Sequence, residues 1–244
     1  IQSMKMIISP QYNFIFMKVN KTATSSIELF LAENIEKEAI VTPINPGGKS
    51  LYEGRNIPTI NGKPIFQNHE SFAEIKEIIG LPNIDFFNNA RKIACVRNPW
   101  ALMATTFEWR KLKKDNRAID NSFKNWLYGN FNLSMYKVPH VMTSIFNQDG
   151  TSRYYKKENK NNTSIPIADT IIKFEDLENN FKDVCKIIGI KNTDFKLKKT
   201  ASSNRKKHYS FYYDDETIEL VYNNFKPVID YFNYHFNKEE HSSA

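Results

Sequence analysis

Three short apolar runs, each followed by a polar turn and a helical pattern, recur along the chain. They lie at 14–19, 93–96 and 170–174, and their length and apolar character are typical of buried parallel strands. A further strand is predicted over 38–42. Because strands alternate with helices, the pattern predicts an α/β domain, arranged as a three-layer α/β/α sandwich around a mainly parallel sheet.

Apolar positions at helical spacing predict the helices that cover this sheet. The predicted helices run from a loop at 22–26 to about Glu36, from Ser71 to Ile79, from about Pro99, over Phe123–Tyr128, from Leu177 to a stop at Gly189, and from Asp214 to about Phe232. Residues 43–66 break regular structure with prolines and glycines. They predict either an excursion on the active-site side or a plain surface loop, with a hairpin turn at Asn61-Gly62.

The first strand leads directly into a loop whose residue types suit an anion. Four hydroxyl residues, Thr22, Thr24, Ser25 and Ser26, surround Ala23 at the predicted helix start, and Lys21 adds a full positive charge. Helix N-termini carry backbone N–H groups without intrahelical partners, which attract phosphate and sulfate. The segment therefore predicts a phosphate- or sulfate-binding loop. A capped helix beside an ordinary surface lysine is the alternative.

The second strand ends at Arg97, just before the Asn98-Pro99 pair that opens the next helix. An arginine at the carboxyl edge of a parallel sheet is well placed to bind a phosphate through two parallel hydrogen bonds. Thr105 lies two turns into the following helix, where its hydroxyl can reach the same group. The alternative is an arginine held in a salt bridge at the end of a strand.

Composition favours one large folded domain with anionic partners. The chain has 244 residues, of which 41% are hydrophobic, and a formal net charge of +7. We expect a single domain over residues 1–244, with its core at about 12–236. The charge is compatible with nucleic acid, a nucleotide cofactor or an acidic polysaccharide, and equally with a solvated lysine-rich surface.

The two cysteines, Cys95 and Cys185, lie in apolar segments and predict core thiols rather than a disulfide or a metal site. No apolar run approaches the ~20 residues that cross a bilayer, so no membrane span is expected. A reducing, cytoplasmic location fits these features. Residues 1–3 precede Met4 and are interpreted as a cloning remnant or as the start of a trimmed chain, with a removed leader or membrane anchor as the open alternative.

The run KVNKTATSSI resembles the 5′-phosphosulfate loop of sulfotransferases that use 3′-phosphoadenosine 5′-phosphosulfate (PAPS), and Lys21 to Ser26 carry the match. The similarity is to the carbohydrate group, of the sulfotransferase family 2 type, which includes heparan 2-O-sulfotransferases. Arg97 and Thr105 resemble that family's 3′-phosphate motif, in which an arginine precedes a serine by eight residues. Thr105 keeps the hydroxyl, whereas Leu102 stands where many members have a second arginine.

The resemblance implies further site residues. His69 matches a histidine that acts as the base toward the acceptor hydroxyl, with Glu70 as its rival. Arg205 and Lys206 match a basic loop that covers the nucleotide. Lys21 would then be catalytic, together with His69, as well as cofactor-binding.

The fold and reaction implied are a nucleotide-kinase-like P-loop sulfotransferase fold and transfer of the sulfuryl group from PAPS to a hydroxyl. Adenosine 3′,5′-bisphosphate would be the product, and an oligosaccharide or polysaccharide the expected acceptor. No metal and no nucleic-acid partner are expected.

Two other functions remain open. An ATP-dependent small-molecule kinase of related fold would need the Walker A glycines, and no glycine lies between residues 1 and 46. A non-enzymatic nucleic-acid-binding protein would use the net charge and bind oligonucleotides with an affinity that falls steeply with salt.

Overall fold

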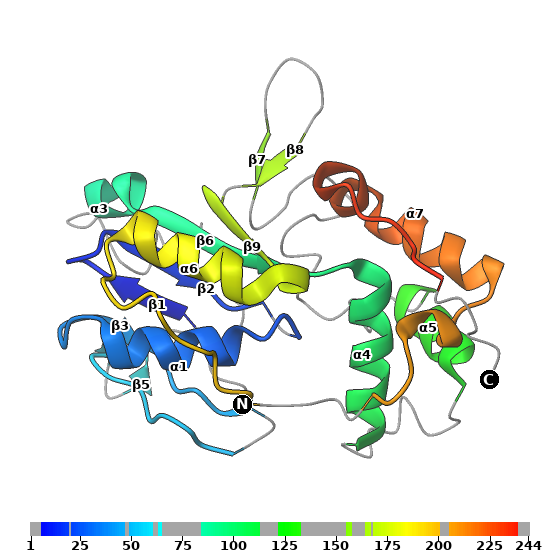
Figure 1. The fold of residues 1–244 in the computed structure, drawn as a ribbon, viewed down its shortest axis with the longest axis horizontal. Coiled ribbons are helices and arrows are strands. Elements are labelled where there is room, and N and C mark those ends of the chain that lie inside the picture. Colours follow the sequence, from blue (N-terminus) through cyan, green and yellow to red (C-terminus); the bar gives the residue numbers. More distant parts are fainter. Residues whose placement is uncertain are drawn as a thin grey trace.

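A five-stranded sheet forms the centre of the protein, shown here by a computed structural model (Figure 1). The structure describes residues 6–19, 21–46, 49–60, 63–64, 84–112, 122–132, 155–157, 164–166, 168–200 and 205–238. Within these residues the strand order of the main sheet is β3-β1-β2-β6-β9.

The strands of this sheet are β1 Met6–Ser9, β2 Phe14–Met17, β3 Ile40–Val41, β6 Arg91–Val96 and β9 Thr170–Lys173. β2, β6 and β9 run parallel to one another, while β1 is antiparallel to both β2 and β3. Two separate two-stranded sheets pair β4 Thr59–Ile60 with β5 Lys63–Pro64 and β7 Tyr155–Lys157 with β8 Ser164–Pro166. The sheet is mixed but mostly parallel.

The sequence predicted β2, β3, β6 and β9 but not β1. A turn over residues 10–13 joins β1 to β2, and Asn13 adopts a left-handed conformation there with a φ of 50°. Asparagine tolerates this conformation better than most residues. The resulting hairpin places an antiparallel strand inside an otherwise parallel sheet, which strand–helix alternation alone does not indicate.

The helices of the described residues are α1 Thr24–Asn34, α3 Ile84–Asn89, α4 Pro99–Leu112, α5 Phe123–Asn132, α6 Leu177–Ile188 and α7 Asp215–Phe232, with 3-10 turns η4 Phe174–Asp176 and η5 Tyr209–Tyr212. Gly189 ends α6 in the left-handed conformation that C-caps require. Asp214 begins α7 through a capping box with Thr217. Predicted boundaries at these positions are confirmed.

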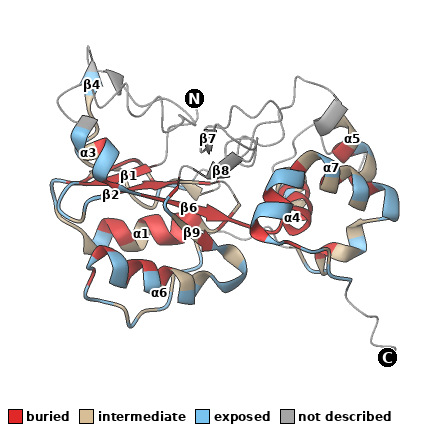
Figure 2. Ribbon diagram, turned by 90° about the horizontal axis from the view of Figure 1, so that it is seen from above, coloured by how far each residue is buried: buried red, intermediate tan, exposed pale blue. Residues whose placement is uncertain are grey.

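One face of the sheet packs against α1 and α6 (Figure 2). Phe14 and Phe16 of β2 point to this face and are fully buried, as is Ile27 of α1. Phe181 of α6 adds an edge-on aromatic contact with Phe30 of α1, at 5.4 Å between ring centroids. Alternate β2 residues therefore fix α1 on this face, directly after the loop that joins the two elements.

The opposite set of β2 side chains belongs to a second core that includes α4, α5 and α7. Ile15 and Met17 lie in it together with Trp100, Phe107 and other residues of these helices. α4 begins just after β6 and leads away from the carboxyl ends of the parallel strands, where α5 and α7 pack beside it (Figure 1). The site at these strand ends is therefore bordered by α1 on one side and α4 on the other.

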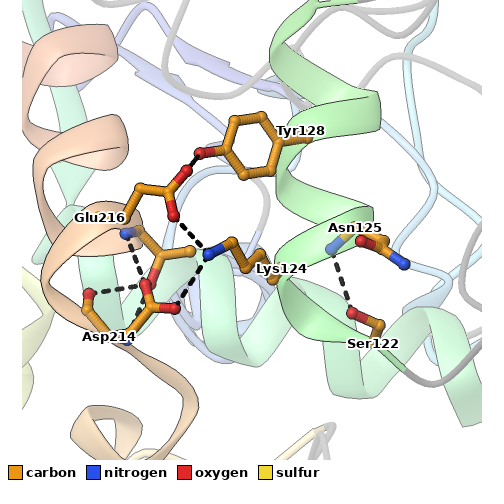
Figure 3. Close-up of polar contacts among 7 residues, drawn as sticks. Ser122, Lys124, Asn125, Tyr128, Asp214 and Glu216 are labelled. Carbon is orange, nitrogen blue, oxygen red and sulfur yellow. Dashed lines mark hydrogen bonds and ion pairs between the residues drawn. The ribbon is translucent and has the colours of Figure 1, made fainter.

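Polar contacts fasten α5 to the start of α7 (Figure 3). Lys124 pairs with Glu216 and, at 3.3 Å, with Asp214. Tyr128 donates a hydrogen bond to Glu216. These side chains are substantially exposed, so the contacts orient the two helices more than they stabilise the fold.

The segment after β3 is tied to the far end of α1. Arg55 donates hydrogen bonds of 2.7 Å to the carbonyl of Ala32, in the last turn of that helix, and to the carbonyl of Glu36, just beyond its end. The predicted anion-binding loop, residues 21–26, lies at the other end of α1. The part of 43–66 around Arg55 therefore lies at the end of α1 away from that loop, where the arginine satisfies the Ala32 carbonyl that the helix leaves unpaired. This position favours the plain-surface-loop alternative for that part.

An α/β fold with an open, mostly parallel sheet is confirmed. The third layer and the P-loop sulfotransferase fold remain predictions. No helix among the described residues is long and apolar enough to cross a membrane.

Candidate functional site

The loop between β2 and α1 is folded tightly without glycine. Lys21 and Ala23 both adopt left-handed conformations, with φ of 62° and 57°. The hydroxyls of Thr22 and Thr24 both donate to the carbonyl of Val19, at 2.7 and 2.9 Å. Two of the hydroxyls predicted to cradle an anion therefore stabilise the loop itself. The Ser26 N–H pairs with the Ala23 carbonyl, and the other N–H groups at the start of α1 are candidate donors to a ligand.

A buried ion pair supports the loop from below. Lys18 donates to the Glu28 carboxylate at 2.7 Å and to the Ser25 hydroxyl at 2.6 Å, and both charged side chains are almost completely buried. The pattern of residue types in the sequence does not single out either residue. Glu28 follows Thr24 by one helical turn, on the inward face of α1, and that position was the available signal.

Arg97 follows β6 and reaches across to the loop. Its guanidinium donates a 2.9 Å hydrogen bond to the carbonyl of Lys21 and lies over the ring of Phe174, with 3.8 Å from Cζ to the ring centroid. The residue is only 7% exposed. Burial, and secondarily the positive charge of Arg205, lower the pKa of Arg97 to about 10, so the group remains charged at neutral pH.

The positive charge of Arg97 is not neutralised by a directly bonded carboxylate in the described part of the chain. Glu175 is near enough to influence it, but its two oxygens accept hydrogen bonds from the Asn98 backbone and from the Tyr234 hydroxyl. The Nε–H of Arg97 is buried without a hydrogen-bond partner among the described residues. Within these residues, Arg97 is therefore not held in a salt bridge, which was the alternative. An anionic ligand would supply both a counter-charge for the guanidinium and an acceptor for its Nε–H.

Thr105 of α4 presents the same feature in a neutral group. Its hydroxyl is buried and, within the described ranges, has no hydrogen-bond partner. Its neighbour Thr106 donates instead to the Leu102 carbonyl at 2.8 Å, the usual arrangement for a threonine inside a helix. A buried hydroxyl without a partner is costly, which favours a ligand as its missing partner.

Lys21 extends toward α4. Its ammonium lies 3.5 Å from the ring centroid of Trp109, in a cation–π arrangement. Trp109 follows Thr105 by one helical turn, so the two residues share a face of α4. The face that carries the unsatisfied hydroxyl is thus also the face that contacts the loop lysine.

Arg205 and Lys206, the two site residues predicted from the C-terminal segment, differ in their surroundings. The positive charge of Arg205 acts on Arg97 and on Tyr209, Tyr212 and Tyr213, and it lowers the pKa of Arg97. Lys206 is exposed. Ser26 lies 3.2 Å from the Thr200 hydroxyl, so the segment before Arg205 passes the start of α1.

His69 and Glu70, the predicted base and its rival, lie outside the described residues. Cys95 and Cys185 are both buried and unpaired, as predicted, and burial raises the pKa of both thiols. Among the residues that the structure describes, no group of three or more His, Cys, Asp or Glu side chains could hold a metal ion.

No protein-family model, curated protein sequence or solved structure matches this chain. What the site can bind therefore follows from its own residues. Lys21 and Arg97 bring positive charge to one end of the parallel strands, and the charge of Arg205 acts on Arg97, while the Lys18–Glu28 pair neutralises itself. A small molecule with two separate anionic groups suits this arrangement.

We expect the Glu28→Gln substitution to lower the free energy of unfolding by about 3 kcal/mol, because it leaves the Lys18 ammonium buried without a counter-charge. Urea denaturation measures the change. Glu33→Gln is the matched control on the same helix: it removes an exposed ion pair with Lys198 and should cost less than about 1 kcal/mol. Equal effects of the two substitutions would contradict a supporting role for the buried pair.

Proposed function

We propose that the protein is a sulfotransferase that transfers the sulfuryl group of PAPS to an acceptor hydroxyl, on a carbohydrate. The observation that carries the proposal is the pair of buried, unpartnered donors, Arg97 Nε and Thr105 Oγ1, next to a loop of the 5′-phosphosulfate type. Arg97 and Thr105 are the two residues whose spacing resembles the 3′-phosphate motif of PAPS-dependent enzymes.

The residues present fit a 3′-phosphorylated nucleotide. Arg97 and Thr105 would hold the 3′-phosphate. Each has a buried donor that no described residue accepts from, so a bound phosphate would supply the missing acceptor. The loop from Lys21 to Ser26 and the start of α1 would hold the 5′-phosphosulfate through backbone N–H groups. Arg205, whose charge acts on Arg97, would add positive charge to the same region.

PAPS supplies the sulfuryl group, and the protein's residues supply alignment and charge. The Lys21 ammonium would neutralise negative charge that develops on the departing phosphate oxygens. His69 would accept the proton of the acceptor hydroxyl, because an imidazole has its pKa near neutral pH. A sugar hydroxyl is the proposed acceptor on the strength of the family resemblance.

Calorimetric titration with adenosine 3′,5′-bisphosphate tests the cofactor class. We expect micromolar binding, with ADP and ATP at least ~30-fold weaker, since a desolvated contact between an arginine and a phosphate is worth about 2 kcal/mol or more. Arg97→Ala should remove this preference. Equal affinities for the three nucleotides in the wild-type protein would overturn the proposal, and oligonucleotide binding that falls steeply with salt would favour a nucleic-acid-binding protein.

The two adjacent threonines of α4 provide a sharper test of the 3′-phosphate site. Thr105→Val keeps the shape but removes the unpartnered hydroxyl, so affinity for the bisphosphate should fall by about 10-fold or more. Thr106→Val removes a hydroxyl that already bonds to Leu102 and should leave affinity unchanged. Calorimetry of both variants decides, and a loss in Thr106→Val alone would mean that the wrong threonine has been assigned.

The base is tested by paired substitutions. His69→Ala should reduce turnover on the order of 10²-fold while nucleotide affinity stays near that of the wild type. Turnover is measured as release of adenosine 3′,5′-bisphosphate from PAPS in the presence of glycan acceptors. Glu70→Gln is the control and should retain activity. The reverse result would assign the base to Glu70.

A further inference from the structure

The contact between Lys21 and Trp109 joins the two halves of the site. Trp109 belongs to α4, one turn after Thr105, whereas Lys21 belongs to the loop before α1. The lysine ammonium lies 3.5 Å from the indole ring centroid, the shortest of the cation–π separations among the described residues. The sequence motifs drew attention to Lys21 but not to its aromatic partner.

We propose that Trp109 is the positioning residue for Lys21, fixing its ammonium where the 5′-terminal phosphate or phosphosulfate of the nucleotide binds. The inference rests on the proposed function. Trp109 would act on the ligand only through Lys21, and this effect would be confined to the 5′ end of the nucleotide.

The backbone of Lys21 is constrained by its conformation and by a hydrogen bond to its carbonyl. Its φ of 62° is left-handed, and its carbonyl accepts the hydrogen bond from Arg97. The side chain, by contrast, has four rotatable bonds, and ordering it on binding has an entropic cost. An aromatic face that holds the ammonium beforehand removes part of that cost from the binding step.

A cation–π contact with Trp109 is compatible with a contact between the same ammonium and an anion. A cation over a ring face approaches the π system from one side, and a lysine ammonium carries three N–H donors. The indole therefore attracts the ammonium through the face of its ring, and this contact does not require all three N–H donors of the ammonium. Trp109 is itself half-buried, which strengthens the contact relative to one in open water.

Affinity cycles with two ligands test the assignment. Trp109→Leu should weaken binding of adenosine 3′,5′-bisphosphate by roughly 3- to 30-fold, the range expected for one cation–π contact. Adenosine 3′-monophosphate lacks the group that Lys21 contacts, so its affinity should be unchanged. Trp109→Phe retains a ring face and should restore most of the loss. Leu112→Ala, an exposed position on the same helix, should change neither affinity.

The double variant separates positioning from a purely structural role. In a Lys21→Ala background, Trp109→Leu should have no further effect on bisphosphate affinity. A loss that persists there, or that is equal for the two ligands, would overturn the inference while leaving the proposed function intact.

Fluorescence of the ligand-free protein tests the contact independently of the proposed function. Lys21→Ala should alter the tryptophan emission of the wild-type protein but not that of Trp109→Leu, because the ammonium lies over the Trp109 indole. If the wild-type protein shows no bisphosphate preference, the proposed function fails. Equal emission changes in the two backgrounds would then also overturn the Lys21–Trp109 contact.

Discussion

The parallel pairing of β2 with β6 is the constraint on which the site depends. Its register sets Met17 opposite Ala94, so the residues that follow each strand emerge at the same edge of the sheet. One strand continues into the loop that carries Lys21 and the other into Arg97, and the 2.9 Å hydrogen bond from Arg97 to the Lys21 carbonyl closes the gap between them. Two residues 76 positions apart in sequence thereby become one site.

Burial gives this site its preference for anions. The Arg97 guanidinium has lost most of its contact with water, and its pKa falls to about 10 as a result, yet it keeps its charge at neutral pH. Phe174 covers one face of the group without neutralising it. The buried cation of Lys18 is handled differently, because Glu28 lies 2.7 Å away. Lys18 therefore has a structural role, whereas Arg97 has no directly bonded anionic partner among the described residues.

The sequence was sufficient for features that repeat locally. The apolar runs located β2, β6 and β9, and the loop and Arg97 were recognised because each follows such a run directly. It was insufficient where a charged residue is buried by tertiary structure: Lys18 and Glu28 have the appearance of surface residues until α1 is packed on the sheet. The hydroxyls of Thr22 and Thr24 show the same limit, since composition indicates donors but not that Val19 uses them.

The loop between β2 and α1 contains no glycine, the residue that adopts left-handed conformations without steric strain. Left-handed conformations at Lys21 and Ala23 cost about 1 kcal/mol each for residues that carry a Cβ. The threonine hydrogen bonds to Val19 offset part of this cost, and the Arg97 hydrogen bond to Lys21 offsets more. Arg97 is therefore both a proposed ligand contact and a support of the loop. A nucleotide that draws on the remaining donors of Arg97 would stiffen the same contact that keeps Lys21 in its strained conformation, so the two halves of the site would tighten together.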